Sequence, residues 1–356
     1  MSDTVAARAN VAGSTAGGGT AGSGTAGRGA GAQHAVGWEA PDARRRLQLA
    51  LGVSWLLDAV LQYQSFMFTR AFARTLAASA AGNPAVVADP IIWSARLIEQ
   101  HAVAMNSAFA TVQLLLAIGI AWRPTVRIAL GASVAWSLGV WWLGEGLGAV
   151  LTGNANPLSG APGAVIIYAL LAVLLWPVAT DRPSAFAAGR SVGTKAARAL
   201  WAVLWGSLAC LALQPAARAP RGLGGMITGM AAGQPGWLAA IDRHLGMLLD
   251  QHGQAASIVL AVTLAVIAAG IYLPAPAARA AIALAVIAAM AIWAAEALGG
   301  VLTGSGTDPN SGPLLALLAV AYWPSGARVP RLARTSGTGT GPVAMGLAGA
   351  AGRGPA

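Results

Sequence analysis

Long apolar runs constrain this chain more than any other feature of its sequence. A helix that spans a bilayer needs roughly 20 apolar residues, and a soluble domain has too little interior to hide many such runs from water. Only 10% of the residues are charged, whereas soluble domains contain about 25%. We therefore predict an all-α integral membrane protein. Its eight transmembrane helices are expected at about 47–65, 106–122, 128–147, 162–177, 199–213, 255–273, 279–298 and 312–323.

A constant offset of 151 residues relates the two halves of the chain. Glu145–Gly153 reads Glu-Gly-Leu-Gly-Ala-Val-Leu-Thr-Gly, and Glu296–Gly304 matches it at seven of nine positions. Separated matches in one register indicate an internal duplication. Because each copy would hold four helices, an even number, we expect two parallel four-helix repeats related by a pseudo-twofold axis along the membrane normal. Further matches at this offset join 80–84 to 231–235 and 99–101 to 250–252.

The rest of the chain is divided around these repeats. Low-complexity composition predicts disordered tails at 1–43 and 326–356. Between them we place a first repeat at 44–178, a basic cytoplasmic linker at 179–198 and a second repeat at 199–325.

Arginine and lysine gather in the short segments that would share one side of an eight-helix bundle. This pattern is typical of cytoplasmic loops, so both termini are predicted in the cytoplasm of a multi-pass protein of a bacterial inner membrane. It also assigns the net charge of +10 to loops and tails and not to nucleic-acid binding. The longer segments 66–105 and 214–254 would lie outside, and their amphipathic stretches 85–101 and 236–250 would lie on the membrane surface or cap the bundle.

Glu145 and Glu296 stand at the outer ends of predicted helices, one in each copy. Ionisable groups at membrane depth are costly and usually functional, although a carboxylate that caps the amides of the next helix is an equally good structural interpretation. Short segments interrupted by glycine and proline at matching places in two halves indicate a binding site. Thr152 and Thr303, in the same matched loops, are therefore candidates as well.

Two acidic residues precede histidines at matching positions: Glu99 with His101, and Asp250 with His252. A carboxylate can orient and charge an imidazole, so these pairs and the two glutamates could hold a proton, a metal or a quinone head group. A solvated helix end is the simpler interpretation, because residues two apart on a helix do not face one another. No HxxxH, CxxC or HExxH spacing favours a dedicated metal site.

Asp58 lies inside the first predicted helix, opposite Leu208 in the second copy at an offset of 150, at which Trp55 and Gln64 also match Trp205 and Gln214. An intramembrane carboxylate can relay protons or pair with arginine. Its absence from the second copy means that a symmetric mechanism does not need it.

Two segments carry a resemblance to a known group. Arg46–Gly52 reads Arg-Leu-Gln-Leu-Ala-Leu-Gly, and Gln113–Gly119 reads Gln-Leu-Leu-Leu-Ala-Ile-Gly. In these features each copy resembles the DoxX/DoxD-like membrane-protein group, here tandemly duplicated. The resemblance implies a four-helix architecture, and some members are subunits associated with thiosulfate or quinone redox chemistry. The group usually has a basic residue near the end of helix 1, where this chain has Gln62–Gln64, so no catalytic residue is carried over.

Three function classes remain open. The first is a non-enzymatic membrane subunit or accessory protein, associated with redox or quinone chemistry and with a membrane or soluble partner. The second is a transporter of a small solute or ion with a pseudo-symmetric site. An enzyme is least favoured, because no Walker loop, Rossmann fingerprint or Ser-His-Asp signal is present. Convergence of Glu145, Glu296, His101 and His252 would favour the transporter, and their scattering would favour the accessory subunit.

Overall fold

All regular elements in the described part of the chain are helices, as the sequence predicts. A computed structural model describes residues 42–179, 182 and 184–324, and the predicted tails lie almost wholly outside this part. Each predicted apolar run falls on a helix. These helices are α1 (Ala43–Leu61), α4 (Ala102–Ala121), α5 (Val126–Leu143), α6 (Ala164–Leu174), α8 (Thr194–Ala212), α12 (Gly253–Gly270), α13 (Ala275–Ala295) and α14 (Ser311–Ala321).

Four helices in the described residues are long and apolar enough to cross a membrane: α4, α5 with the turn before it, α12 and α13. Between 28% and 33% of the apolar window in each of these helices is buried inside the structure, which fits a membrane protein. By contrast, α6 and α14 have 11 residues each. At about 1.5 Å per residue these two helices are too short for a hydrocarbon core of about 30 Å.

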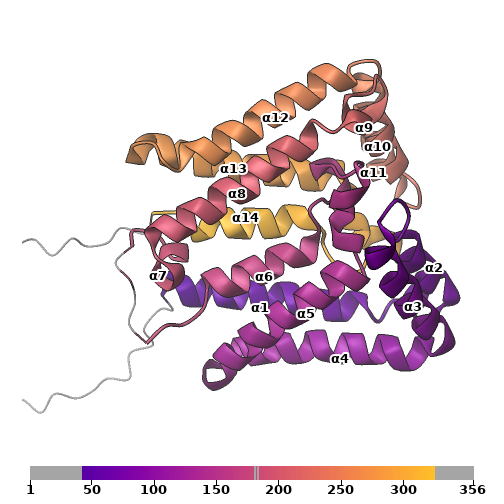
Figure 1. Cartoon of the computed structure of the whole chain (residues 1–356), viewed down its shortest axis with the longest axis horizontal. Helices are drawn as coiled ribbons and strands as arrows, with labels where there is room; N and C mark the ends of the chain where they lie inside the picture. Colours follow the sequence, from indigo (N-terminus) through magenta and orange to yellow (C-terminus); the bar gives the residue numbers. More distant parts are fainter. Residues whose placement is uncertain (1–41, 180–181, 183, 325–356) are drawn as a thin grey trace, which may run out of the picture. The chain divides into compact units, whose positions relative to one another are not determined.

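The helices on the predicted apolar runs pack in pairs that match between the two halves. α1 lies along α4 and α5 along α6, whereas α8 lies along α12 and α13 along α14. The short helices α6 and α14 contact one another, so they join the two halves (Figure 1). Buried aromatic side chains support this centre: the rings of Trp55 and Tyr168 are 4.1 Å apart, and the Tyr322 hydroxyl donates to the Ala197 carbonyl oxygen at 2.6 Å.

Arginine side chains tie helix ends together at one end of this bundle. Arg45, near the start of α1, donates to the carbonyl oxygen of Ile120 at the end of α4, at 2.8 Å. Arg127, near the start of α5, donates to the carbonyl oxygen of Pro177 after α6, at 3.1 Å. The segment predicted as a linker contains α7 (Ala188–Val192) and the first turn of α8.

Shorter helices gather at the opposite end. In the first half they are η1 (Ser65–Phe68), α2 (Arg70–Ala78) and α3 (Ala85–Gln100), and in the second half α9 (Pro215–Arg218), α10 (Gly222–Met230) and α11 (Gly236–Leu249). Figure 1 shows both groups at the end where α5 leads toward α6. α3 and α11 occupy the two stretches that are amphipathic in the sequence, and α3 packs against α5.

Candidate functional site

In the repeated nine-residue sequence of each half, the glutamate is followed by a left-handed turn. In η3 (Gly146–Thr152), four consecutive residues from Gly146 to Ala149 have φ between 56° and 61°. In η5 (Ala297–Thr303), Ala297 to Gly300 have φ between 52° and 69°. Left-handed backbone costs an L-residue roughly 1–2 kcal/mol, and only part of each turn is glycine. Such strain persists where the surrounding structure enforces it, and it clusters at functional sites.

This turn directs Glu145 toward the start of α6. The Oε1 atom of Glu145 accepts a hydrogen bond from the Val165 backbone N–H at 3.3 Å. Gly163, with φ of 111°, makes the approach possible, because a Cβ there would lie 2.0 Å from Oε2 of Glu145. A carboxylate at a helix N-terminus is stabilised by the helix dipole, so the capping role expected from the sequence is present in the first half.

Glu296 has the same place in the second half. It is only 2% exposed, and its Oε1 accepts a hydrogen bond from the Ser311 hydroxyl at 2.9 Å, at the start of α14. Burial raises its pKa to about 8, opposed by the Ser311 hydroxyl and assisted by the nearby carboxyl of Asp308.

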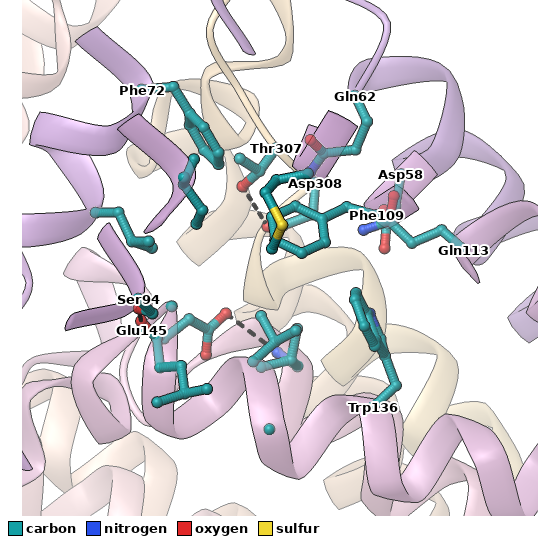
Figure 2. Close-up of a pocket in the computed structure, with 18 of the residues that line it drawn as sticks. Asp58, Gln62, Phe72, Ser94, Phe109, Gln113, Trp136, Glu145, Thr307 and Asp308 are labelled. Atoms are coloured by element: carbon teal, nitrogen blue, oxygen red, sulfur yellow. Dashed lines mark hydrogen bonds between the residues drawn. The ribbon is translucent and has the colours of Figure 1, made fainter. Parts of the chain in front are cut away.

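Glu145 also lines a large cavity, and Glu296 is not among the described residues that line it. This cavity has a volume of about 480 Å³ and lies among α1, α3, α4, α5 and the loop before α14. Asp58, Glu145 and Asp308 bring carboxyl groups to its wall from three different elements (Figure 2). No Lys, Arg or His is among the described residues that line it. Its apolar wall includes Phe72, Trp93, Met105, Phe109, Trp136 and Val140.

Several polar atoms on this wall lack partners. Asp58 is 1% exposed, and its Oδ1 has no hydrogen-bond partner among the described residues. The same holds for Oε1 of Gln62, Oε1 of Gln113 and Oε2 of Glu145. Tyr168 of α6 lies beside the Asp58 carboxyl. Unpartnered buried oxygens are expensive, so a wall with four of them is suited to a ligand that donates hydrogen bonds or carries positive charge.

Asp308 reaches this cavity from the second half of the chain. Its Oδ2 accepts from the Thr307 hydroxyl at 2.8 Å and its Oδ1 from the Asn310 backbone N–H at 2.7 Å. Desolvation by the surrounding protein raises its pKa, although these two hydrogen bonds oppose the change. The pKa of Glu145 is raised well above its ordinary value, mainly by desolvation and further by the Asp308 carboxyl.

The three carboxyls are spread over the wall and do not gather around one point. In the described part of the chain, no group of three or more His, Cys, Asp or Glu side chains is placed to hold a metal ion.

The other candidate residues lie outside this cavity. Thr152 and Thr303 close their own loops, donating to the carbonyl oxygens of Ala149 and Gly300 at 2.8 and 2.6 Å. They therefore stabilise the end of each left-handed turn.

The histidines and their acidic neighbours lie at the ends of short helices. His101 and His252 are exposed, and Glu99 is half-buried at the end of α3. Asp250 forms an ion pair with Arg221 at 3.4 Å, and its carbonyl oxygen contacts Nδ1 of His252 at 2.8 Å. The structure thus places Asp58 and Glu145 on one cavity and separates both from the two His pairs. Glu145, Glu296, His101 and His252 are therefore scattered, which by itself favours the accessory subunit over a transporter with a pseudo-symmetric site. A transporter has to rest on the cavity of the first half and not on these four residues.

Sequence reasoning missed the remaining polar residues of the cavity. Asp308, Gln62 and Gln113 were not among the candidates, although Asp308 stands in the same loop as the second glutamate motif. One signal was available, because the second copy has leucine at position 264, the counterpart of Gln113 at the 151-residue offset. A polar residue in one copy opposite an apolar residue in the other indicates a role specific to one half.

The raised pKa of Glu296 predicts a pH-dependent stability. The folded protein holds this proton up to about pH 8, whereas the unfolded chain loses it near the ordinary value of 4.5. The free energy of unfolding should therefore fall as the pH rises between these values. Glu296→Gln has no proton to lose, so its Tm relative to the unsubstituted protein should increase by several degrees across this window. Parallel Tm curves for the two proteins, measured by scanning fluorimetry, would contradict this assignment.

Comparison with known proteins adds no relative to this description. No family model matches the chain, and no curated protein or solved structure matches it.

Proposed function

We propose that this chain is a membrane transporter for a small organic cation, which it binds in the cavity of its first half. The observation that carries the proposal is the wall itself: three carboxyl groups, aromatic side chains and no basic residue among those described. Carboxylates attract a positive charge, and aromatic faces bind organic cations through their quadrupole. The cavity volume lies in the range of small-molecule sites, which is about 300–1,000 Å³.

The charge of the wall separates this ligand class from others. Once the carboxyls are ionised, an anion would meet three negative charges with no basic residue among the described lining residues, and like charges repel. A neutral apolar molecule would leave the oxygens of Asp58 and Glu145 without partners, which costs free energy. A cation with an apolar body satisfies both parts of the wall.

The proposal includes the two parallel four-helix repeats expected from the sequence, although α6 and α14 are shorter than the eight full spans of that expectation require. Its support is the recurrence of element bounds: α1 and α8 both have 19 residues and begin 151 positions apart, and η3 and η5 have the same offset. Their matching helix pairs add to this support. Arg45 and Arg127 lie at one end of the bundle with the segments that join helices there. We place that end of the bundle, and both termini, on the cytoplasmic side of a bacterial inner membrane.

The two halves would then be unequal in function. At the positions that correspond to Asp58, Phe109 and Gln113, the second half has Leu208, Leu260 and Leu264. Leu208 and Leu264 are fully buried. The second half therefore has leucine where the first half has the polar side chains of Asp58 and Gln113. Its own contribution to the cavity is Asp308.

Glu145→Gln tests the role of the carboxyls with little change in shape. Titration of the purified protein with tetraphenylphosphonium, followed by calorimetry, should give an affinity at least about tenfold lower for the variant, because a desolvated charge partner is lost. Glu99→Gln is the matched control, since Glu99 does not line the cavity, and it should bind as the unsubstituted protein does.

The pH dependence of binding has a defined sign. A protonated Glu145 carries no charge, and its pKa is raised, so the affinity for a cation should increase with pH as this proton is lost. Glu145→Gln should show a weaker dependence on pH. Affinity that falls with rising pH, or that does not change in the variant, would contradict the proposal.

The same titration discriminates the redox-associated subunit, which is the other function class expected from the sequence. A quinone is neutral, so its binding should be insensitive to Glu145→Gln. Retention of a ubiquinone analogue by both proteins, without binding of tetraphenylphosphonium, would favour that class and the DoxX/DoxD-like resemblance.

A further inference from the structure

The cavity is exposed along the side lined by α4 and α5, two helices of membrane-spanning length, because its lining residues Ala135 and Gly139 are exposed. We call this side the opening. α4 and α5 are close at the turn that joins them, where a Cβ on Gly119 would lie 2.8 Å from the Cβ of Ala129. Figure 1 shows α5 rising away from α4 beyond this turn. At this side the Phe109 and Trp136 rings, one from each helix, lie across the gap between the helices with centroids 5.8 Å apart, so they must separate for a ligand to pass.

Small residues on α5 form one edge of this opening. Ala135 and Gly139 line the cavity, and both are exposed. A Cβ added to Gly139 would meet no atom within 4 Å. The two residues lie one turn apart, so α5 has no bulky side chain along this edge.

The opening faces the surface that such helices present to lipid. Ile128 and Trp142 are exposed on α5 at helical spacing from Ala135 and Gly139, with 77% and 43% of their areas accessible. A helix of this length and composition has its exposed apolar face in the hydrocarbon region.

We propose that the ligand enters this cavity laterally from the bilayer, through the opening between α4 and α5. The substrate class is then a membrane-partitioning cation, with an apolar body that dissolves in lipid and a positive group that reaches Asp58, Glu145 and Asp308. This inference rests on the proposed function, because it presumes a cationic ligand in the cavity.

Gly139→Phe places a ring across the opening. In lipid nanodiscs, the association rate of tetraphenylphosphonium, followed by tryptophan fluorescence, should fall at least about tenfold, and dissociation should slow as well. Gly206→Phe is the matched control: Gly206 lies on α8, a Cβ there meets no atom within 4 Å, and it does not line the cavity. It should leave both rates unchanged. An unchanged association rate in folded Gly139→Phe would overturn lateral entry while leaving cation binding in place.

A second measurement needs no variant. Alkyltrimethylammonium ions of increasing chain length share one charge but partition increasingly into lipid, so their association rates with the unsubstituted protein should increase along the series. Rates independent of chain length would overturn lateral entry. Failure of every member of the series and of tetraphenylphosphonium to bind would overturn both lateral entry and the proposed function.

Discussion

Gly148→Ala should prevent the protein from folding to a stable state. Gly148 lies within the left-handed turn after Glu145, and a Cβ there would be 2.0 Å from the carbonyl oxygen of Pro162. That oxygen belongs to backbone and also accepts from Trp141 Nε1 at 2.6 Å, so it cannot move without loss of this contact. The added methyl would push the turn away from α6, which carries the amide that binds Glu145. We expect a loss well above the usual range of point substitutions, which is about 0.5–3 kcal/mol.

Gly153→Ala is the control that isolates this clash. Gly153 has φ of 75°, but a Cβ there meets no atom within 4 Å. Gly153→Ala should therefore lower the free energy of unfolding only by the strain of a left-handed L-residue, about 1–2 kcal/mol. Gly299→Ala repeats the test in the second half, where a Cβ would lie 2.6 Å from the Pro309 carbonyl oxygen. Equal Tm values for Gly148→Ala and Gly153→Ala in detergent would show that the turn does not pack on α6 as described.

Asp58→Leu should abolish cation binding and at the same time stabilise the fold. Asp58 is 1% exposed, and one of its carboxyl oxygens has no partner among the described residues. Removing the carboxyl should therefore raise the free energy of unfolding by about 1–3 kcal/mol. Leucine is the residue that the second half has at the corresponding position 208, where it is fully buried. Opposite effects on stability and on binding are typical of a functional group maintained at a cost to the fold.

Asp242→Ile is the matched control for this substitution. Asp242 of α11 is fully buried and neither carboxyl oxygen has a partner among the described residues, but it does not line the cavity. Isoleucine is its counterpart in the first half, at position 91. Asp242→Ile should therefore raise the Tm without changing cation affinity. A fall in Tm for Asp58→Leu would mean that the carboxyl supports the fold, and its role as a ligand group would lose its basis.

The helices of this protein could be predicted from sequence because apolar runs are local signals. Every predicted run lies on a helix, and Glu145 and Glu296 were identified from the repeated motif. The left-handed turn could not be predicted in the same way. Leu147 and Leu298 both adopt the left-handed conformation although neither is glycine, so packing against the next helix imposes it.

The composition of the cavity depends on contacts between distant segments. Asp58, Glu145 and Asp308 belong to separate elements, and Asp308 comes from the other half of the chain. No spacing in the sequence places them together. The two His pairs matched in sequence as well as the glutamates did, yet both histidines are exposed, because α3 ends at Gln100 and α11 ends at Leu249.

Calorimetric titration of three proteins with tetraphenylphosphonium tests the central claim most directly, namely that the carboxyl-lined cavity binds a cation. The unsubstituted protein and Asp242→Ile should bind with equal affinity, and Asp58→Leu, although folded and more stable, should show no heat of binding. Binding of the cation to Asp58→Leu with undiminished affinity would contradict the claim, because the ligand would then lie elsewhere.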